Sequence, residues 1–187
     1  MSIESPRYTL IQREDKFEIR DYEEYIVAEV DVTGSYNNAL YKGFRILAGY
    51  IFGGNIARAS IAMTSPVAER STTQSETIEM TRPVSAYRKQ DQVYTISFSM
   101  PEKYTLDTLP RPNDDNIRLR VVPAARVAVF RFSGRLNERL ATKKTSELME
   151  ILKQKNLKPT SGATSCQYNP PWIPGFFRTN EVMVSIE

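Results

Sequence analysis

The sequence of 187 residues contains no histidine and a single cysteine, Cys166. Histidine is the side chain whose unperturbed pKa lies near neutrality, and it is the commonest metal ligand. Its absence excludes Ser-His-Asp and Cys-His nucleophilic sites, together with zinc and iron sites that contain histidine. A single cysteine excludes an intrachain disulfide, a CxxC redox pair and a four-cysteine metal cluster. These absences leave ligand binding as the main class of function.

Further shortages narrow the class of protein. No uninterrupted apolar run approaches the ~20 residues of a membrane-spanning helix, so we expect no stable membrane insertion. Residues 1–6 lack the basic and apolar stretches of a signal peptide. One free thiol suits a reducing compartment, and we therefore expect a cytoplasmic protein. The net charge of +3 is small, so it does not indicate a nucleic-acid surface and is compatible with an anionic small ligand.

An internal repeat organises much of the sequence. Residues 27–34 align with residues 127–134 at a spacing of 100 positions. Apolar side chains alternate in both copies, which is the pattern of a strand with one buried face. These side chains are Ala28, Val30 and Val32 in the first copy and Ala128, Phe130 and Phe132 in the second. Each copy ends in Thr-Gly or Ser-Gly, and a helical pattern follows.

Two helices are predicted, one after each copy of the repeat. Residues 36–51 and 136–155 have apolar side chains at helical spacing, which gives each helix one apolar face. Ser35 is a suitable N-cap for the first helix, and the Gly53-Gly54 pair permits the positive φ that ends it. The predicted apolar positions are Ala39, Leu40, Gly43, Phe44, Leu47, Ala48 and Ile51, and then Leu136, Leu140, Leu148, Ile151 and Leu152.

The remaining short apolar or alternating segments predict further strands. They are residues 8–12, 17–22, 61–67, 77–87, 93–100, 117–122, 166–171 and 181–186, with a hairpin loop at 88–92 and polar loops at 69–76 and 102–116. Only two helices are predicted for about eight strands, and this ratio predicts an α+β fold in which both helices pack on an antiparallel sheet. The repeat predicts pseudo-twofold symmetry for this sheet. We expect one domain over residues 1–187, with approximate halves 1–100 and 101–187.

A series of short motifs carries a family resemblance. The motifs are residues 17–22, 27–30, 43–47, 50–51, 53–55, 61–67, 98–101, 109–112, 132–134, 168–171 and 178–182. In this order, over roughly residues 8–186, they resemble the SOUL haem-binding protein family. The resemblance implies a distorted, barrel-like antiparallel sheet flanked by two helices. It also implies kinship with effector-binding domains of bacterial transcription regulators and with gyrase-inhibitor-like proteins, which bind small hydrophobic molecules between two halves.

The same resemblance implies that haem or another tetrapyrrole binds in a hydrophobic groove along the first helix. The residues of this chain at that place are Leu40, Tyr41, Lys42, Phe44, Arg45, Leu47 and Ala48. Leu40, Phe44 and Leu47 would form the apolar slot for the macrocycle. Lys42 and Arg45 would bind its two propionates. The alternative is that the apolar side chains belong to the core and that the two cations are solvated.

Iron ligation in such a site would have to proceed without histidine. The other side chains that ligate haem iron are tyrosine, cysteine thiolate and methionine. The candidates are Tyr41, which lies in the implied pocket, Met63 and Cys166. For Cys166 the alternative is a buried, inert thiol, and for Met63 it is a side chain that fills a gap in the core.

The aromatic stretch at residues 172–178 allows two interpretations. Exposed, it would be a surface for a partner or a lid over the groove. Braced by its prolines, it would fold onto the sheet, and this second interpretation is the one we favour.

Three functional hypotheses follow, in order of preference. The first is a tetrapyrrole-binding or buffering protein. The second is a general binder of small apolar or cationic molecules, similar to regulator effector domains, but without a helix-turn-helix segment for nucleic acid. The third is an enzyme that uses carboxylate or tyrosine acid-base chemistry on a hydrophobic substrate, for which a titrating group in the groove would be needed. We expect a binding protein and not an enzyme.

Overall fold

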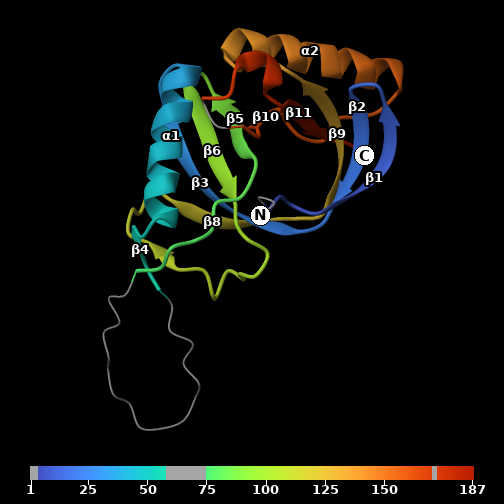
Figure 1. Cartoon of the computed structure of the whole chain (residues 1–187). Helices are drawn as coiled ribbons and strands as arrows, with labels where there is room; N and C mark the ends of the chain where they lie inside the picture. Colours follow the sequence, from blue (N-terminus) through green and yellow to red (C-terminus); the bar gives the residue numbers. More distant parts are fainter. Residues whose placement is uncertain (1–3, 58–74, 170–171) are drawn as a thin grey trace, which may run out of the picture.

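One antiparallel sheet collects strands from the whole length of the chain and curls into an open half-barrel (Figure 1). The computed structural model describes residues 4–57, 75–169 and 172–187. Its nine-stranded sheet has the order β1-β2-β9-β11-β10-β5-β6-β3-β8, and β4 pairs with β7 separately. The strands are β1 (Tyr8–Glu14), β2 (Phe17–Tyr22), β3 (Tyr25–Thr33), β4 (Asn55–Ile56), β5 (Val84–Gln90), β6 (Val93–Ser99), β7 (Arg111–Pro112), β8 (Arg118–Val122), β9 (Ala125–Phe132), β10 (Thr164–Gln167) and β11 (Asn180–Ser185).

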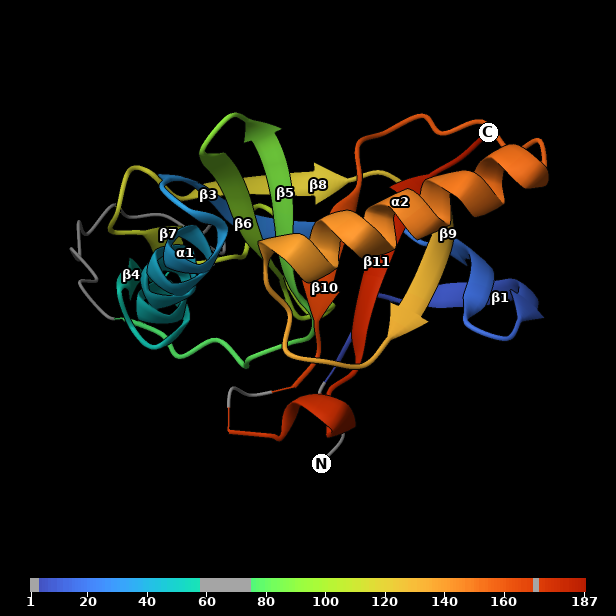
Figure 2. The same ribbon diagram turned by 90° about the horizontal axis from the view of Figure 1, so that it is seen from above.

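Two long helices cover the outer face of this sheet (Figure 2). Helix α1 (Tyr36–Ile51) lies against β3 and β6, and helix α2 (Glu138–Gln154) lies against β9 and β11. The α+β fold with an antiparallel, barrel-like sheet is therefore confirmed. Strands from the two sequence halves are interleaved, because β2 pairs with β9 and β8 pairs with β3. None of the helices in the described residues is long and apolar enough to cross a membrane.

The helix boundaries follow from the caps. Helix α1 has the predicted bounds: Ser35 is its N-cap residue, without a side-chain cap bond, and Gly53 beyond its end has a φ of +112°. Helix α2 begins two residues later than position 136, because Asn137 caps it by accepting a hydrogen bond from the Leu140 backbone N–H at 2.9 Å. Asn156, with a φ of +55°, follows its C-terminal end.

The alternating strand residues divide cleanly between the two faces of the sheet. The apolar set predicted from period two lies on the convex face, under the helices, and forms the core with the inner faces of both helices. Its strand members include Ala28, Val30, Val32, Ile96, Phe98, Ala128, Phe132, Val182 and Val184. The residues between them point to the concave face. The main core therefore lies on the convex side, while a smaller apolar cluster of Tyr22, Val127 and Val129 packs on the concave side and leaves much of that face available for another role.

Helix α1 approaches β6 closely at one glycine. A Cβ atom on Gly43 would lie 2.5 Å from Ile96 Cγ1 and 2.6 Å from Ile96 Cβ. These distances are shorter than any normal carbon contact, so only glycine allows α1 to lie at this height over the sheet.

Three local predictions need correction. The strand expected over residues 77–87 begins only at Val84, because Pro83 has no N–H to donate to the ladder. The hairpin loop expected at 88–92 is shorter, since β5 continues to Gln90 and Gln92 takes the positive φ of the turn. The tail at residues 172–178 is not folded onto the sheet: the Trp172 residue is 78% exposed and Phe176 is 71% exposed. The strand expected at 61–67 lies outside the described residues.

Candidate functional site

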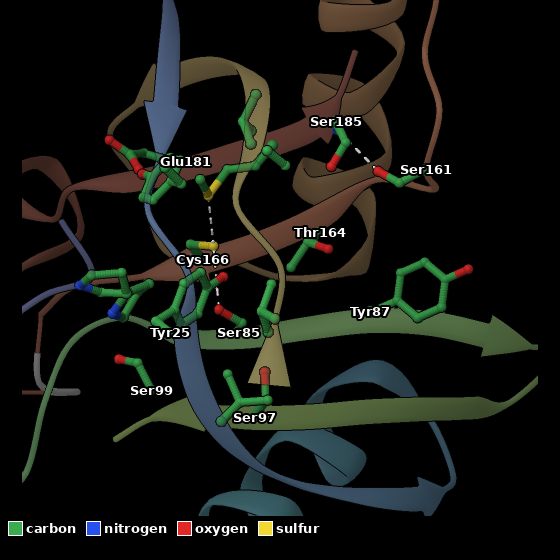
Figure 3. A pocket seen from close by; sticks show the side chains of 18 of the residues that line it. Tyr25, Ser85, Tyr87, Ser97, Ser99, Ser161, Thr164, Cys166, Glu181 and Ser185 are labelled. Carbon is green, nitrogen blue, oxygen red and sulfur yellow. Dashed lines mark hydrogen bonds between the residues drawn. The ribbon is translucent and has the colours of Figure 1, made fainter. Parts of the chain in front are cut away.

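The concave face of the sheet encloses a cavity of about 1050 Å³ (Figure 3). Its wall consists of the strand residues that alternate with the core residues, from β1 on one edge to β8 on the other. On β6, for example, Thr95, Ser97 and Ser99 face the cavity, whereas Ile96 and Phe98 face the core. The cavity thus follows from the alternation of side chains along each strand, because one set packs in the core and the other set faces the cavity.

Hydroxyl and sulfur groups line the middle of the cavity (Figure 3). The Ser85 hydroxyl lies 3.4 Å from the Cys166 sulfur, and the Cys166 thiol donates to the Met183 Sδ at 3.3 Å. Cys166 is 1% exposed, and its burial raises the pKa of the thiol to about 12. It is therefore a buried, neutral thiol, which agrees with the inert alternative and not with a thiolate ligand.

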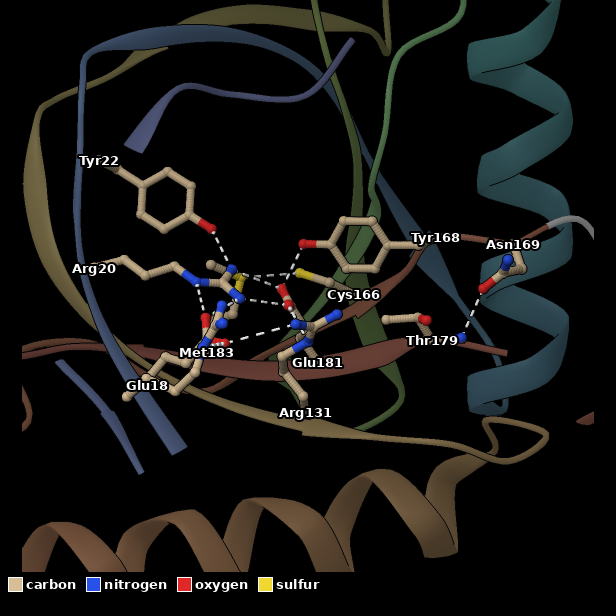
Figure 4. A network of polar contacts seen from close by, with 11 residues as sticks. Glu18, Arg20, Tyr22, Arg131, Cys166, Tyr168, Asn169, Thr179, Glu181 and Met183 are labelled. Atoms are coloured by element: carbon tan, nitrogen blue, oxygen red, sulfur yellow. Dashed lines mark hydrogen bonds and ion pairs between the residues drawn. The ribbon is translucent and has the colours of Figure 1, made fainter. Parts of the chain in front are cut away.

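One end of the cavity is closed by a buried ionic network (Figure 4). Arg20, on β2, is only 2% exposed. Its guanidinium binds Glu18 through Nη2 at 2.6 Å and binds Glu181, on β11, at 2.7 and 3.1 Å. Arg131, on β9, lies 3.6 Å from Glu18 and 3.5 Å from Glu181. Arg13, whose side chain is 53% exposed, also binds Glu18 at 2.8 Å, so two buried carboxylates share three guanidinium groups.

The charges of this network stabilise one another against burial. Burial opposes the cation of Arg20, but the hydrogen bonds and charge of Glu181 outweigh it and raise the Arg20 pKa. Burial likewise opposes the Glu18 anion, and Arg20 outweighs it, so the pKa of Glu18 is lowered. Both groups remain ionised at neutral pH.

Two tyrosines complete the network. The Tyr22 hydroxyl accepts a hydrogen bond from Arg20 Nη1 at 2.9 Å, and the Tyr168 hydroxyl donates to Glu181 at 2.5 Å. Burial raises the pKa of both phenols. Each stays neutral at physiological pH, and the two oxygens of Glu181 are both occupied by donors.

The opposite end of the cavity carries a second, more exposed set of charges. Glu29, on β3, receives Arg118 at 3.4 Å and Arg120 at 3.1 Å, both from β8. Asp31 receives Arg118 at 3.0 Å and Lys89 at 2.8 Å. Burial opposes the Asp31 anion, but the hydrogen bonds from Arg118 and Lys89 outweigh it and lower the Asp31 pKa.

The residues predicted along the first helix are divided between the core and solvent. Leu47 is fully buried, and Leu40 and Phe44 pack against the core; the Phe44 ring meets the Phe98 ring edge-on at 5.4 Å. Ala48 is half-buried between these side chains and solvent. The three residues proposed as an apolar slot thus make the contacts that the core alternative describes.

The polar residues of that helix lie outside the sheet. Tyr41 is 65% exposed, with the Arg45 guanidinium 5.8 Å from its ring. Lys42 and Arg45 border an open hollow of about 540 Å³ between α1 and β3. Tyr41 on the outside and Cys166 in the cavity lie on opposite faces of the sheet, so one ligand cannot meet both, and Met63 lies outside the described residues.

The described residues contain no group of three or more histidine, cysteine, aspartate or glutamate side chains placed to hold a metal ion. The concave site itself was missed in the sequence, although one signal for it is present. Glu18, Arg20 and Tyr22 alternate with core residues in a strand, which indicates that the face opposite the core is charged.

Comparison with known proteins places the chain in a family. A sequence model of the family described as SOUL heme-binding protein matches residues 3–185. The chain belongs to the SOUL heme-binding protein family. Among curated proteins, none matches this chain by sequence.

Solved structures share the fold of this SOUL-family chain at low sequence identity. The C-terminal domain of EcmrR has a TM-score of 0.62 and 11% identity, over 96% of this chain and 98% of that one. A hydrolase from Listeria innocua has a TM-score of 0.56 and 12% identity, over 94% of each chain. An uncharacterised conserved protein from Listeria innocua has a TM-score of 0.57 and 12% identity, over 92% of each chain. At these identities the likeness concerns the fold alone.

Proposed function

We propose that this protein binds a tetrapyrrole, or a planar molecule of similar size, in the concave cavity. The observation that carries the proposal is the cavity of about 1050 Å³, built mostly from residues outside the main core. Small-molecule sites occupy roughly 300–1,000 Å³, so this one accommodates a large ligand. Family membership supports a tetrapyrrole as that ligand.

The cavity fits the macrocycle better than it fits an iron ion. Val27, Val127 and Met183 offer apolar contacts at its centre, and Tyr25 lies beside them. The Tyr25 phenol and the Cys166 thiol are neutral, because burial raises the pKa of each to about 12. Met183 already accepts the thiol proton of Cys166. We therefore infer that ring contacts and polar groups hold the ligand, and that neither Tyr25 nor Cys166 ligates iron as an anion.

A binding role fits the cavity better than acid-base catalysis does. A general base needs an oxygen that is free to take a proton near neutral pH. Glu181 accepts from Arg20 and Tyr168, and Glu29 accepts from Arg118 and Arg120. Both buried carboxylates of the cavity are thus committed to donors within the protein.

The hollow beside α1 is a second candidate for the tetrapyrrole. Lys42 and Arg45 border it, and these are the cations that we predict from the sequence to meet propionates. Leu47 and Phe44 pack into the core and do not line this hollow, so the apolar slot predicted along α1 is not part of it. We therefore rank it below the concave cavity.

A titration with protoporphyrin IX, followed by its fluorescence, separates the two sites. Ser97→Trp places a bulky ring into the cavity from the middle of β6, where an aromatic residue suits the strand. Lys143→Trp on the exposed face of α2 is the matched control. We expect Ser97→Trp to weaken binding at least tenfold and Lys143→Trp to leave it unchanged.

The α1 hollow is tested with the double variant Lys42→Gln/Arg45→Gln. Binding that survives Ser97→Trp and disappears in this double variant would move the site to α1. Binding that neither set of variants affects would reject both sites. Urea unfolding of each variant confirms that the fold is retained.

A further inference from the structure

We propose that the concave cavity selects organic anions, and that Arg82 and Arg120 are the side chains that bind the carboxylates of the ligand. The inference rests on the proposed function, since it names the chemical class that the same cavity accepts. Two observations support it: the number of charged side chains around the cavity, and the ion pairs that each of these side chains already forms within the protein.

Cations outnumber carboxylates around the cavity. Six cationic side chains line it: Arg20, Arg82, Lys89, Arg118, Arg120 and Arg131. Two carboxylates line it, Glu29 and Glu181. Two more, Glu18 and Asp31, do not line the cavity but form ion pairs with the lining cations Arg20 and Lys89. Arg13 also binds Glu18, at 2.8 Å, so seven cations face these four carboxylates and leave an excess of three positive charges. A ligand with two carboxylates would neutralise most of this excess.

The carboxylates of the cavity are already engaged, so a cationic ligand would have to displace a guanidinium group. Glu181 holds Arg20 at 2.7 Å and also accepts from Tyr168. Glu29 holds Arg118 and Arg120 within 3.4 Å. Displacing the buried Arg20 from Glu181 would leave Arg20 without this counter-charge, which is costly. A cation therefore gains little at Glu181, and at Glu29 it has to compete with two guanidinium groups.

The positive charges, in contrast, are not all satisfied. Arg82 lines the cavity next to Pro83 and is half-buried, and no described carboxylate forms an ion pair with it. Arg120 shares Glu29 with Arg118 and keeps about half of its side chain exposed. Both lie near Val27: Arg120 is opposite Val27 on β8, and the Arg82 carbonyl accepts from Ser99, which is opposite Val27 on β6. A carboxylate there would receive charge-assisted hydrogen bonds without breaking the buried network around Arg20.

The test compares deuteroporphyrin IX with its dimethyl ester, which keeps the ring and removes both negative charges. We expect the wild-type protein to bind the diacid at least tenfold more tightly than the diester, with a preference that falls as salt is added. Arg82→Gln and Arg120→Gln are each expected to weaken the diacid by roughly tenfold, as for one charge-assisted contact, and to leave the diester unchanged.

Two further variants act as controls. Arg126→Gln removes the same charge from the chain, but Arg126 pairs with Asp21 outside the cavity lining, so binding of the diacid should not change. Glu29→Gln frees Arg118 and Arg120 and should tighten the diacid several-fold while sparing the diester. Urea unfolding of the Glu29 variant verifies that it is folded.

The outcomes separate this inference from the proposed function. Equal affinity for diacid and diester, with Ser97→Trp still blocking both, overturns the anion selectivity and leaves the cavity as the site. Equal losses of both ligands in Arg82→Gln and Arg120→Gln also overturn it. Absence of binding by either compound, or binding unaffected by Ser97→Trp, overturns the proposed function and this inference together.

Discussion

Replacing Arg20 with methionine tests whether the buried network holds the fold as well as the cavity wall. Methionine keeps the length of the side chain and removes the charge. Glu18 and Glu181 are both almost fully buried, and in the variant they lose the guanidinium that binds them at 2.6 and 2.7 Å. Breaking a buried ion pair by removing one partner costs about 3–5 kcal/mol, because the remaining charge is uncompensated. Two cations remain, but Arg131 lies 3.5 Å or more from both carboxylates, and Arg13, which binds Glu18 at 2.8 Å, is 53% exposed and does not reach Glu181, so they replace only part of the lost interaction.

A second arginine in the same sheet provides a matched comparison. Arg126 also forms a two-pronged pair with a carboxylate, since it binds Asp21 at 2.7 and 2.8 Å, but its side chain is 49% exposed. Water and salt screen such a pair, so Arg126→Met should leave the stability unchanged within the error of the measurement. The two substitutions are alike in chemistry and differ mainly in the burial of the pair.

Urea unfolding monitored by circular dichroism measures both effects. A loss of about 4 kcal/mol corresponds to a fall in melting temperature of about 10 °C for a chain of this size. The slope of unfolding free energy against urea should stay constant, because the surface exposed on unfolding does not change. The reasoning is refuted when Arg20→Met and Arg126→Met show an equally small loss of unfolding free energy. It is also refuted when Arg20→Met is more stable than the wild-type protein.

Three further results are expected. Gly43→Ala should destabilise the protein by roughly 1–3 kcal/mol, because the added Cβ clashes with the sheet. Gly49→Ala has open space around its Cβ position and should stabilise the protein by up to about 1 kcal/mol. Urea unfolding of both variants measures the two changes, and a loss of stability in Gly49→Ala equal to that in Gly43→Ala would contradict the close approach of α1. Cys166 should resist Ellman's reagent in the folded protein and react fully in urea, because burial raises its pKa to about 12, and a fast reaction without urea would contradict its buried position. The lowered pKa values of Glu18 and Asp31 mean that their contribution to stability is complete above their unfolded values of 4.5 and 3.8, and that it is lost as the pH falls towards the folded values. The urea midpoint should therefore decrease between neutral pH and about pH 3, and a midpoint that stays constant would argue against the ion pairs.

The convex half of the structure could be predicted because burial leaves a periodic trace in the sequence. Ala28, Val30 and Val32 alternate with polar residues, and this period of two identifies both the strand and its core face. The apolar face of residues 36–51 identified α1 in the same way. The start of α2 was less predictable, because the choice between Leu136 and Asn137 depends on a single capping bond.

The concave half could not be predicted, because a cavity wall and a solvated surface have similar compositions. Ser85, Ser97 and Thr164 are unremarkable polar residues until the curl of the sheet brings them around one space. The pairing of Arg20 with Glu181 joins residues 161 positions apart and depends on the register of β2, β9 and β11. Register is set by tertiary contacts, so sequence spacing contains no signal for this pair.

The separation of the two sheet faces has a consequence for the evolution of this family. A residue such as Ser97 or Thr164 can be exchanged without touching the core, since its neighbours in the strand carry the apolar contacts. Ligand preference can therefore change at little cost in folding, which agrees with the fact that chains with only 11–12% identity keep this fold. Arg20 is an exception to this freedom, because the same side chain both lines the cavity and holds two buried carboxylates.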